Sequence, residues 1–356
     1  MRNSCDQGRG WTTGKMGIGT KLRLGISIGL IVLVILASNP EEVWTALTGI
    51  NVNLILLVVV LYLINLFVKA YRWSVLMGCA GNSVPFRTTF TAFSLCQAIN
   101  NLIPGKVLGE TSRIVEMSAR EGVAIGKGLA SVVTERIMDF AVLTILAVTS
   151  LFLLLASIVE EQRSYLILLV ALMVVANVLL IYVLVRPKLL MRIGAWGARL
   201  TSKAIKGEKG ERYAAKVLGT VRSFNEAVAF SDKRLLVWPS MLTLLIWGNE
   251  IARLYLIIEA LGVDVTLVAV IASASLASLS AVVLTAGSGN VLMSSAVLSA
   301  SGLDPHVAAT AGLLSAITSI WLSVPVSLLA MVVDHRVQQA QSEDLKDADK
   351  NQRGYN

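Results

Sequence analysis

Three groups of charged side chains interrupt apolar stretches of this sequence, and the spacing within each group brings opposite charges together. An acid and a base three or four residues apart lie on the same side of a helix. Such a pair can hold the helix to a neighbour, bind an anion through its arginine, or supply a general base. The groups are Glu110 with Arg113, Glu135 with Arg136 and Asp139, and Glu250 with Arg253.

A polar interruption precedes the first of these groups. The stretch NNLIPG, residues 100–105, sets Pro104 and Gly105 in an apolar run, and both residues break helices. The amides of Asn100 and Asn101 can satisfy the backbone groups that the break exposes. Lipid tolerates such a break only where it is buried in protein or lines a watery cavity, so we expect an interior cavity here.

The residues after the break could bind an anion. If a helix starts after Gly109, its first N–H groups point at one place, and Arg113 lies one turn further on. A planar, permanently charged guanidinium suits a phosphate. A cytoplasmic loop in which Glu110 and Arg113 only pair with each other is the alternative.

Composition indicates that the protein lies in a membrane. The 356 residues are 55% hydrophobic and 15% charged, with a mean hydropathy of +0.71, whereas soluble domains carry about 25% charged residues. Uncharged runs long enough to cross a bilayer recur along the chain. The sequence therefore predicts an all-α polytopic membrane protein with one transmembrane domain over 22–335, between a cytoplasmic tail at 1–21 and a polar C-terminal tail at 336–356.

The net charge of +8 does not indicate nucleic-acid binding. Basic residues gather in loops beside apolar runs, as the positive-inside rule requires, and the loop 186–234 holds twelve Lys and Arg against four acids. We expect this loop to form amphipathic helices on the inner membrane surface. The three cysteines and two histidines have no zinc or disulfide spacing, so we expect no metal and no cofactor.

Hydropathy divides the domain into six simple spans and two interrupted runs. One span ends at Lys69, and Arg72 and Trp73 follow it, which is typical of an anchor at the membrane interface. We expect simple spans at about 22–38, 51–69, 126–157, 164–185, 235–260 and 305–333, and interrupted runs at 88–125 and 265–303.

Charge predicts how these elements cross the membrane. The N-terminal tail and the loop 186–234 are basic and should be cytoplasmic, whereas the loop 39–50 has Glu41 and Glu42 and no Lys or Arg. The neighbouring spans then require 88–125 to start and end inside. We therefore expect a re-entrant hairpin there, turning near its Pro-Gly pair or at the two asparagines just before it.

The second half fits the same pattern with the opposite orientation in the membrane. Its interrupted run breaks at TAGSGN, residues 285–290. The halves 22–157 and 164–335 would then be inverted repeats, and transporters of that kind bind their substrate near the midplane, where the broken elements meet. A plain bundle of eight spans is the alternative.

The residues that we expect along a substrate pathway come from the two breaks and the charged groups. They are Asn100, Asn101, Pro104, Gly105, Gly109, Glu110, Arg113, Glu135, Arg136, Asp139, Glu250, Arg253, Gly287, Gly289 and Asn290.

These motifs together resemble the lysylphosphatidylglycerol-synthase transmembrane-region family, whose members are also called flippase-like, from about residue 20 to 335. The second half departs from the family pattern, because Met293 stands where an acid is usual and Ala316 stands near the place of an arginine. The family patterns N-x-x-x-P, G-[DE]-x-x-R and E-R-x-x-D are met by Asn100 and Pro104, by Gly109, Glu110 and Arg113, and by Glu135, Arg136 and Asp139.

The resemblance implies a lipid translocase in the plasma membrane that moves an anionic lipid or a lipid-linked saccharide between leaflets. Its partners would be lipids with anionic headgroups, with a separate soluble or membrane synthase as a second candidate. We find no catalytic motif and no room for the aminoacyltransferase domain of some relatives. The alternatives are a membrane glycosyltransferase or lipid-modifying transferase, with Glu110, Glu135 or Asp139 as base, and a scaffold for a partner synthase.

Overall fold

The computed structural model of the chain describes residues 40–102, 107–154, 208–228, 233–280 and 288–353, with isolated positions between 32 and 199. Every regular element within these residues is a helix, and no strand occurs among them. The expected all-α polytopic membrane fold is confirmed. Four helical stretches in this part of the chain are long and apolar enough to cross a membrane: Val52–Cys79, Ile125–Leu154, Arg234–Ala260 and Pro305–Ala340.

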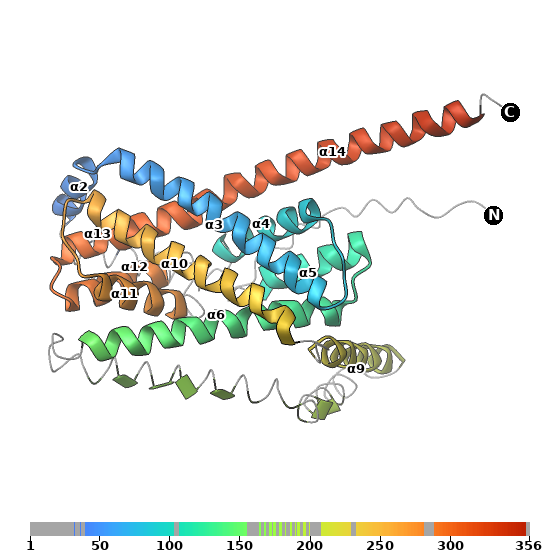
Figure 1. Cartoon of the computed structure of the whole chain (residues 1–356), viewed down its shortest axis with the longest axis horizontal. Helices are drawn as coiled ribbons and strands as arrows, with labels where there is room; N and C mark the ends of the chain where they lie inside the picture. The colour runs from blue at the N-terminus through green and yellow to red at the C-terminus, as the bar shows by residue number, and fades with distance from the viewer. Residues whose placement is uncertain are drawn as a thin grey trace.

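The described helices form an elongated bundle (Figure 1). Apart from isolated positions, the expected spans at 22–38 and 164–185 lie outside the described residues. The helices are α2 (Pro40–Thr48), α3 (Val52–Cys79), α4 (Phe86–Leu102), α5 (Val107–Glu121), α6 (Ile125–Leu154), α9 (Glu208–Val228), α10 (Val237–Ala260), α11 (Leu267–Ser280), α12 (Ser288–Ala300), α13 (Pro305–Ala316) and α14 (Leu322–Arg353).

Helices α3 and α10 run antiparallel along the bundle (Figure 1). The N–H of Asn51, the residue that caps the start of α3, donates to the carbonyl of Ala260 at the end of α10 over 2.9 Å. Val58 and Ile257 are fully buried in the apolar cluster that these helices share with α11 to α13. In lipid, such helices associate through close packing and interhelical hydrogen bonds.

Two pairs of shorter helices lie at opposite ends of the bundle (Figure 1). Helix α4 packs against α5 at one end, and α11 packs against α12 at the other. The helices of these pairs have 17, 15, 14 and 13 residues, fewer than the roughly 20 that a transmembrane helix needs. Helices α4 and α11 end at Leu102 and Ser280, and α5 and α12 begin at Val107 and Ser288, within both of the runs that the sequence marks as broken.

Both ends of the α4–α5 segment meet at one carboxylate. Arg87 Nε, at the start of α4, lies 3.1 Å from Asp334 Oδ1 of α14. Arg120 Nη2, at the end of α5, lies 2.7 Å from Asp334 Oδ2. The segment therefore returns to the end of the bundle from which it departs, as a hairpin does.

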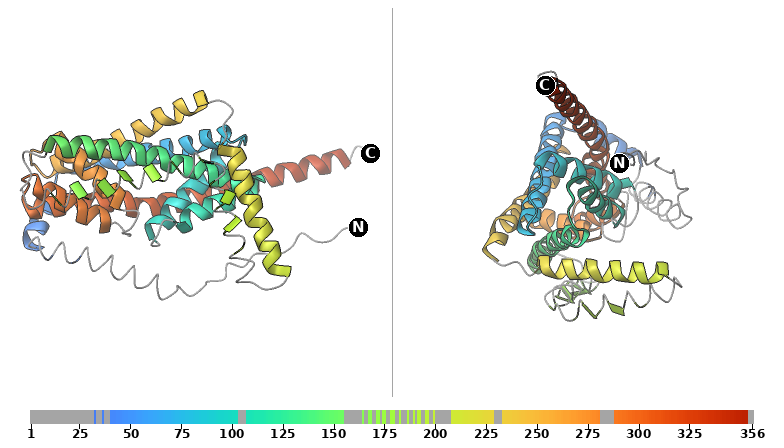
Figure 2. Two further views of the ribbon diagram at one scale, coloured as in Figure 1. Left: turned by 90° about the horizontal axis from the view of Figure 1, so that it is seen from below. Right: turned by 90° about the vertical axis from the view of Figure 1, so that its right-hand side faces the viewer.

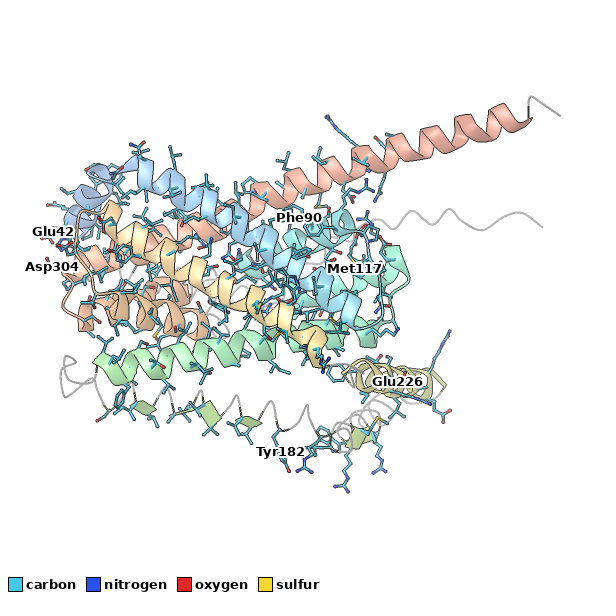
Figure 3. The ribbon with its side chains drawn as sticks, in the orientation of Figure 1. Glu42, Phe90, Met117, Tyr182, Glu226 and Asp304 are labelled. Atoms are coloured by element: carbon cyan, nitrogen blue, oxygen red, sulfur yellow. The ribbon has the colours of Figure 1, made fainter. Side chains whose placement is uncertain are left out.

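The two ends of the bundle differ in charge. Glu42 of α2 pairs with His306 of α13 over 3.0 Å, and Asp304 lies at the same end (Figure 3). Arg87 and Arg120 lie at the opposite end, which the positive-inside rule predicts to be cytoplasmic. The described segments at the acidic end, 40–60, 256–275 and 293–310, contain no Lys or Arg.

Helix α9 is the described helix of the basic loop, and it lies across the start of α6 (Figure 2). Phe224 is buried, whereas Arg222 and Glu226 are exposed and pair with each other. A Cβ at Gly126 of α6 would lie 2.5 Å from the carbonyl oxygen of Thr220, so the two helices cross in close contact. The one-sided burial agrees with the amphipathic helix expected from the sequence.

The last apolar run is not one continuous α-helix. A π-helical turn, Ile317–Trp321, separates α13 from α14, and Pro325 lies inside α14. A proline has no N–H to donate to the carbonyl four residues earlier, here that of Trp321, which accounts for the irregular turn before it. Helix α14 then continues to Arg353, well beyond the bundle, so most of the expected C-terminal tail is helical (Figure 1).

The hairpin arrangement of α4 and α5 can be tested by cysteine labelling in cells. In a variant without Cys5, Cys79 and Cys96, we expect Ser83→Cys and Glu121→Cys to react from the cytoplasmic side, because both exposed residues flank the helix pair held by Asp334.

Glu41→Cys, on α2, is the matched control and should react only from the outside. Reaction of Ser83→Cys and Glu121→Cys from opposite sides of the membrane would show that α4 and α5 cross it once.

Candidate functional site

Six ionisable side chains meet in the interior of the bundle, and we call them the interior charge cluster. Three are cationic and three are anionic, so the cluster is neutral as a whole. Buried charges are tolerated when each has a partner. The members are Arg72 from α3, Glu110 and Arg113 from α5, and Glu135, Arg136 and Asp139 from α6.

Arg72 joins α3 to α6 through two carboxylates. Its guanidinium binds Asp139 with two hydrogen bonds of 2.6 and 3.1 Å, and it lies 3.3 Å from Glu135. It also donates to the hydroxyl of Thr243 on α10 over 2.9 Å. Trp247, one turn further along α10, donates its indole N–H to Asp139 over 3.2 Å. The pair thus holds three helices together.

Arg113 is enclosed completely. Its guanidinium lies between Glu110 and Glu135, at 3.0 Å from the latter, and its side chain is 0% exposed. The rings of Trp73 and Phe93 lie on it, with their centroids 4.7 and 5.1 Å from Cζ. In this conformation the Arg113 side chain therefore has no free surface at which a headgroup could bind. The hypothesis from the sequence that a headgroup binds Arg113 is not supported.

Arg136 is the accessible cation of the interior charge cluster. Its side chain is 33% exposed, although it pairs with Glu110 and lies 3.6 Å from Asp139. Glu110 is shared between Arg113 and Arg136, so one carboxylate joins the enclosed part of the cluster to the open part.

A second group of polar side chains lies where α3 faces α10, and we call it the α3–α10 charge group. Glu250 accepts a hydrogen bond from Asn65 over 2.9 Å and pairs with Lys69 over 2.7 Å and with Arg253 over 2.8 Å. The ring centroid of Tyr62 lies 5.0 Å from Arg253 Cζ. The group therefore joins the two halves of the chain.

The contribution of α3 corrects one prediction from the sequence. Lys69, Arg72 and Trp73 do not form an anchor at the membrane interface, because α3 continues to Cys79. Arg72 and Trp73 are buried, and the Trp73 indole donates to Ser131 over 3.0 Å. The signal for this lies in the spacing of Asn65, Lys69 and Arg72, which puts three polar residues on one side of an otherwise apolar helix.

The residues around the first break support the interior charge cluster from α4. Asn100 donates to Glu110 over 3.3 Å, and Asn101 donates to Ser323 of α14 over 2.8 Å. Helix α5 begins at Val107, three residues before the start considered above, so Gly109 lies in its first turn. A Cβ at Gly109 would lie 2.5 Å from the carbonyl oxygen of Cys96 and would also overlap the Asn100 amide, so only glycine fits there.

Five of the predicted pathway residues contribute no described side chain to the site. Pro104, Gly105 and Gly287 lie outside the described residues, and Gly289 and Asn290 are placed only as part of the first turn of α12. Helix α12 contains no charged residue, so its described part adds no charge to the bundle. Among the described residues, no group of three or more His, Cys, Asp or Glu side chains could hold a metal ion.

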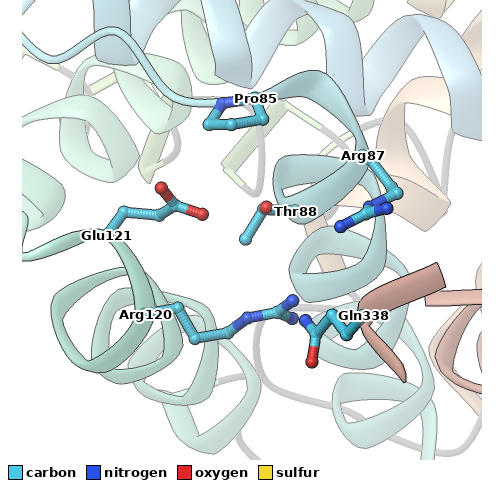
Figure 4. A pocket seen from close by; sticks show the side chains of 6 residues that line it. All are labelled: Pro85, Arg87, Thr88, Arg120, Glu121 and Gln338. Carbon is cyan, nitrogen blue, oxygen red and sulfur yellow. The ribbon is translucent and has the colours of Figure 1, made fainter. Parts of the chain in front are cut away.

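An open pocket of about 510 Å³ lies at the basic end of the bundle (Figure 4). Arg87 and Arg120 line it, but both pair with Asp334, and Glu121 adds a further negative charge. The pocket therefore has no excess of positive charge. Its other lining residues are Pro85, Thr88 and Gln338.

Comparison with known proteins identifies the family of the chain. Residues 22–327 match the family described as the lysylphosphatidylglycerol synthase TM region. The chain belongs to this family. The motifs that carry the resemblance, in 100–113 and 135–139, are the segments that supply five of the six residues of the interior charge cluster.

Several archaeal relatives cover most of the chain. A UPF0104 membrane protein of Methanothermobacter thermautotrophicus is 29% identical over 83% of this chain and 90% of its own length. Proteins of the same description from Pyrococcus horikoshii and Methanocaldococcus jannaschii are 23% and 25% identical, over 83% and 87% of this chain and 92% and 90% of their own lengths. No solved structure matches the chain.

The close contact at Gly109 predicts a loss of stability on substitution. We expect Gly109→Ala to lower the free energy of unfolding by about 1–3 kcal/mol, the usual cost of overpacking, because α5 must move away from Cys96 and Asn100. Thermal unfolding in detergent, followed by tryptophan fluorescence, measures this.

Gly248→Ala on α10 is the matched control, because a Cβ there meets nothing within 4 Å. It should leave the unfolding temperature unchanged or raise it slightly, since alanine favours a helix. Equal effects of the two substitutions would contradict the close contact.

The pairing of Arg113 with Glu135 predicts non-additive losses of stability. Arg113→Gln and Glu135→Gln should each cost on the order of 3–5 kcal/mol, because each leaves a buried charge without its partner. The double variant should cost clearly less than the sum of the two. Thermal unfolding of the four proteins measures the coupling.

The same cycle on Arg222 and Glu226 is the control, because these side chains are 79% and 63% exposed. We expect a coupling of about 0.3–0.5 kcal/mol there, as in other exposed helical pairs. Strict additivity at Arg113 and Glu135 would mean that the two side chains do not interact.

Proposed function

We propose that the protein moves lipids with an anionic headgroup between the two leaflets of the membrane. The observation that carries this proposal is the interior charge cluster, in which six ionisable residues lie inside an apolar bundle beside the α4–α5 helix pair. Ionisable residues are rare in membrane interiors, and they commonly mark the path of a polar substrate. Membership of a family named after a lipid synthase region is consistent with a lipid substrate.

The arrangement of the helix pairs supports a transporter architecture. The α4–α5 and α11–α12 pairs lie at opposite ends of the bundle, which is the placement that two inverted repeats would give them (Figure 1). In such transporters the substrate binds near the midplane, where interrupted helices approach each other. We therefore infer that the substrate path runs between the two pairs.

Within the interior charge cluster, we expect the headgroup to meet Arg136 first. Arg136 is the only cation of the cluster with a substantially exposed side chain, whereas Arg72 and Arg113 are closed off by carboxylates and aromatic rings. Arg113 and Arg72 then act as the framework that holds Glu110, Glu135 and Asp139 in place. Removing Arg113 should destabilise the protein and is a poor test of headgroup binding.

The test is a transfer assay in proteoliposomes, with fluorescent phosphatidylglycerol quenched by dithionite from outside. We expect Arg136→Gln to slow the transfer about tenfold or more, the scale of one charge-assisted hydrogen bond. Arg136→Lys should retain part of the rate, because lysine keeps the charge but loses the planar fork.

Fluorescent phosphatidylcholine and the exposed variant Arg222→Gln are the controls, and both wild type and Arg222→Gln should prefer the anionic lipid. The translocase proposal fails if wild type transfers neither lipid. It also fails if wild type transfers the two lipids at equal rates and Arg136→Gln transfers them at the same rates as wild type. The transferase and scaffold alternatives would then take its place.

A further inference from the structure

Among the described residues, the interior charge cluster and the α3–α10 charge group together carry one more positive than negative charge. The interior charge cluster is balanced, but in the α3–α10 charge group the two cations Lys69 and Arg253 share the single carboxylate of Glu250. Among the described residues, no other carboxylate forms an ion pair with either cation. An uncompensated charge in an apolar interior is unfavourable, so the charge of the group favours the binding of one further anion.

Arg253 and Asn65 of the α3–α10 charge group each have one buried atom without a hydrogen-bond partner. These atoms are Nε of Arg253, a donor, and Oδ1 of Asn65, an acceptor. Both residues contact Glu250, through Arg253 Nη1 at 2.8 Å and Asn65 Nδ2 at 2.9 Å. The unused donor calls for an anionic oxygen, and the unused acceptor calls for a hydroxyl group on the same ligand.

The group lies near the middle of the bundle and is open on one side. Lys69 is ten residues before the end of α3, and Glu250 is ten residues before the opposite end of the antiparallel α10, about 15 Å along each axis. The side chains of Lys69 and Glu250 are 19% and 22% exposed, whereas Arg253 is 2% exposed. A ligand would therefore reach Lys69 before Arg253.

We propose that Lys69 and Arg253 bind the phosphate of an anionic, hydroxyl-bearing ligand, with Asn65 accepting a hydrogen bond from its hydroxyl group. The proposal rests on the translocase function and makes it more specific, because it gives the substrate class as a glycerophospholipid with a hydroxylated headgroup. Glu250 competes with the ligand for both cations and holds them together when no ligand is bound. The α3–α10 charge group would thus be a binding site, whereas the interior charge cluster is mainly a framework.

The opposed roles of Lys69 and Glu250 give a test whose two arms differ in sign. Binding of dioctanoyl phosphatidylglycerol to the protein in detergent is measured by microscale thermophoresis. We expect Lys69→Gln to weaken binding about tenfold, and Glu250→Gln to strengthen it by a similar factor, because the first removes a cation and the second removes the competing anion. Lys69→Arg should bind nearly as wild type.

Three controls define the ligand. Dioctanoylglycerol, which has the same chains without phosphate, should not bind, and Arg222→Gln should bind as wild type. Inorganic phosphate should compete only weakly; if it binds as tightly as the lipid, the site is for free phosphate and the lipid assignment is overturned. Thermal unfolding of each variant checks that it is folded. If Lys69→Gln does not fold, Glu250→Gln and Lys69→Arg still decide the test.

Binding and transfer are measured on the same variants, so that the two proposals can fail separately. If the lipid binds with the expected dependence on Lys69 and Glu250 but is not transferred, the site stands and the translocase proposal fails. If the lipid is transferred but Lys69→Gln and Glu250→Gln bind it equally well, the site is overturned and the translocase proposal stands. Absence of binding to wild type also overturns the site.

Discussion

The need to pair Arg72 inside an apolar bundle constrains the rest of the structure. Its guanidinium is closed off from solvent and makes a two-bond contact with Asp139 and an ion pair with Glu135. These contacts fix α3 against α6, and Thr243 brings α10 to the same place. Glu135 also pairs with Arg113 of α5 over 3.0 Å, so the same carboxylates hold a fourth helix in place.

The two groups of charges along α3 have different physical characters. Arg72 belongs to a neutral network in which each charge has an opposite charge as a partner, and such a network stabilises one arrangement of helices. Lys69, one turn earlier on the same helix, shares its carboxylate with Arg253 and is partly exposed. Balanced charges suit a framework, and two cations that share one carboxylate suit an anionic ligand. This difference favours the α3–α10 interface as the place where a substrate is recognised.

Much of the fold was predictable, because long apolar runs and helix breakers leave few alternatives in lipid. The charges of 110–139 could also be expected to meet, since their spacing puts them on facing sides of helices. Arg72 was missed because a basic residue at the end of an apolar run is usually an interface anchor. A charge count offered a clue, since Glu110, Glu135 and Asp139 have only Arg113 and Arg136 as local partners and require a third cation. The contact of Asp334 with both ends of the α4–α5 segment is long-range and leaves no local signal.

The same reasoning explains how the second half can lack the charges that the family resemblance leads one to expect there. Met293 and Ala316 stand where an acid and an arginine are usual, and Ala316 packs in an apolar cluster with Val291 of α12. Removal of one member of a buried pair leaves an uncompensated charge, whereas replacement of both by apolar residues can be nearly neutral. The absence of both members therefore need not destabilise the bundle. Among the described residues of α10 to α13, Glu250 and Arg253 of α10 are the charges inside the bundle, and they face α3, as the binding site proposed above requires.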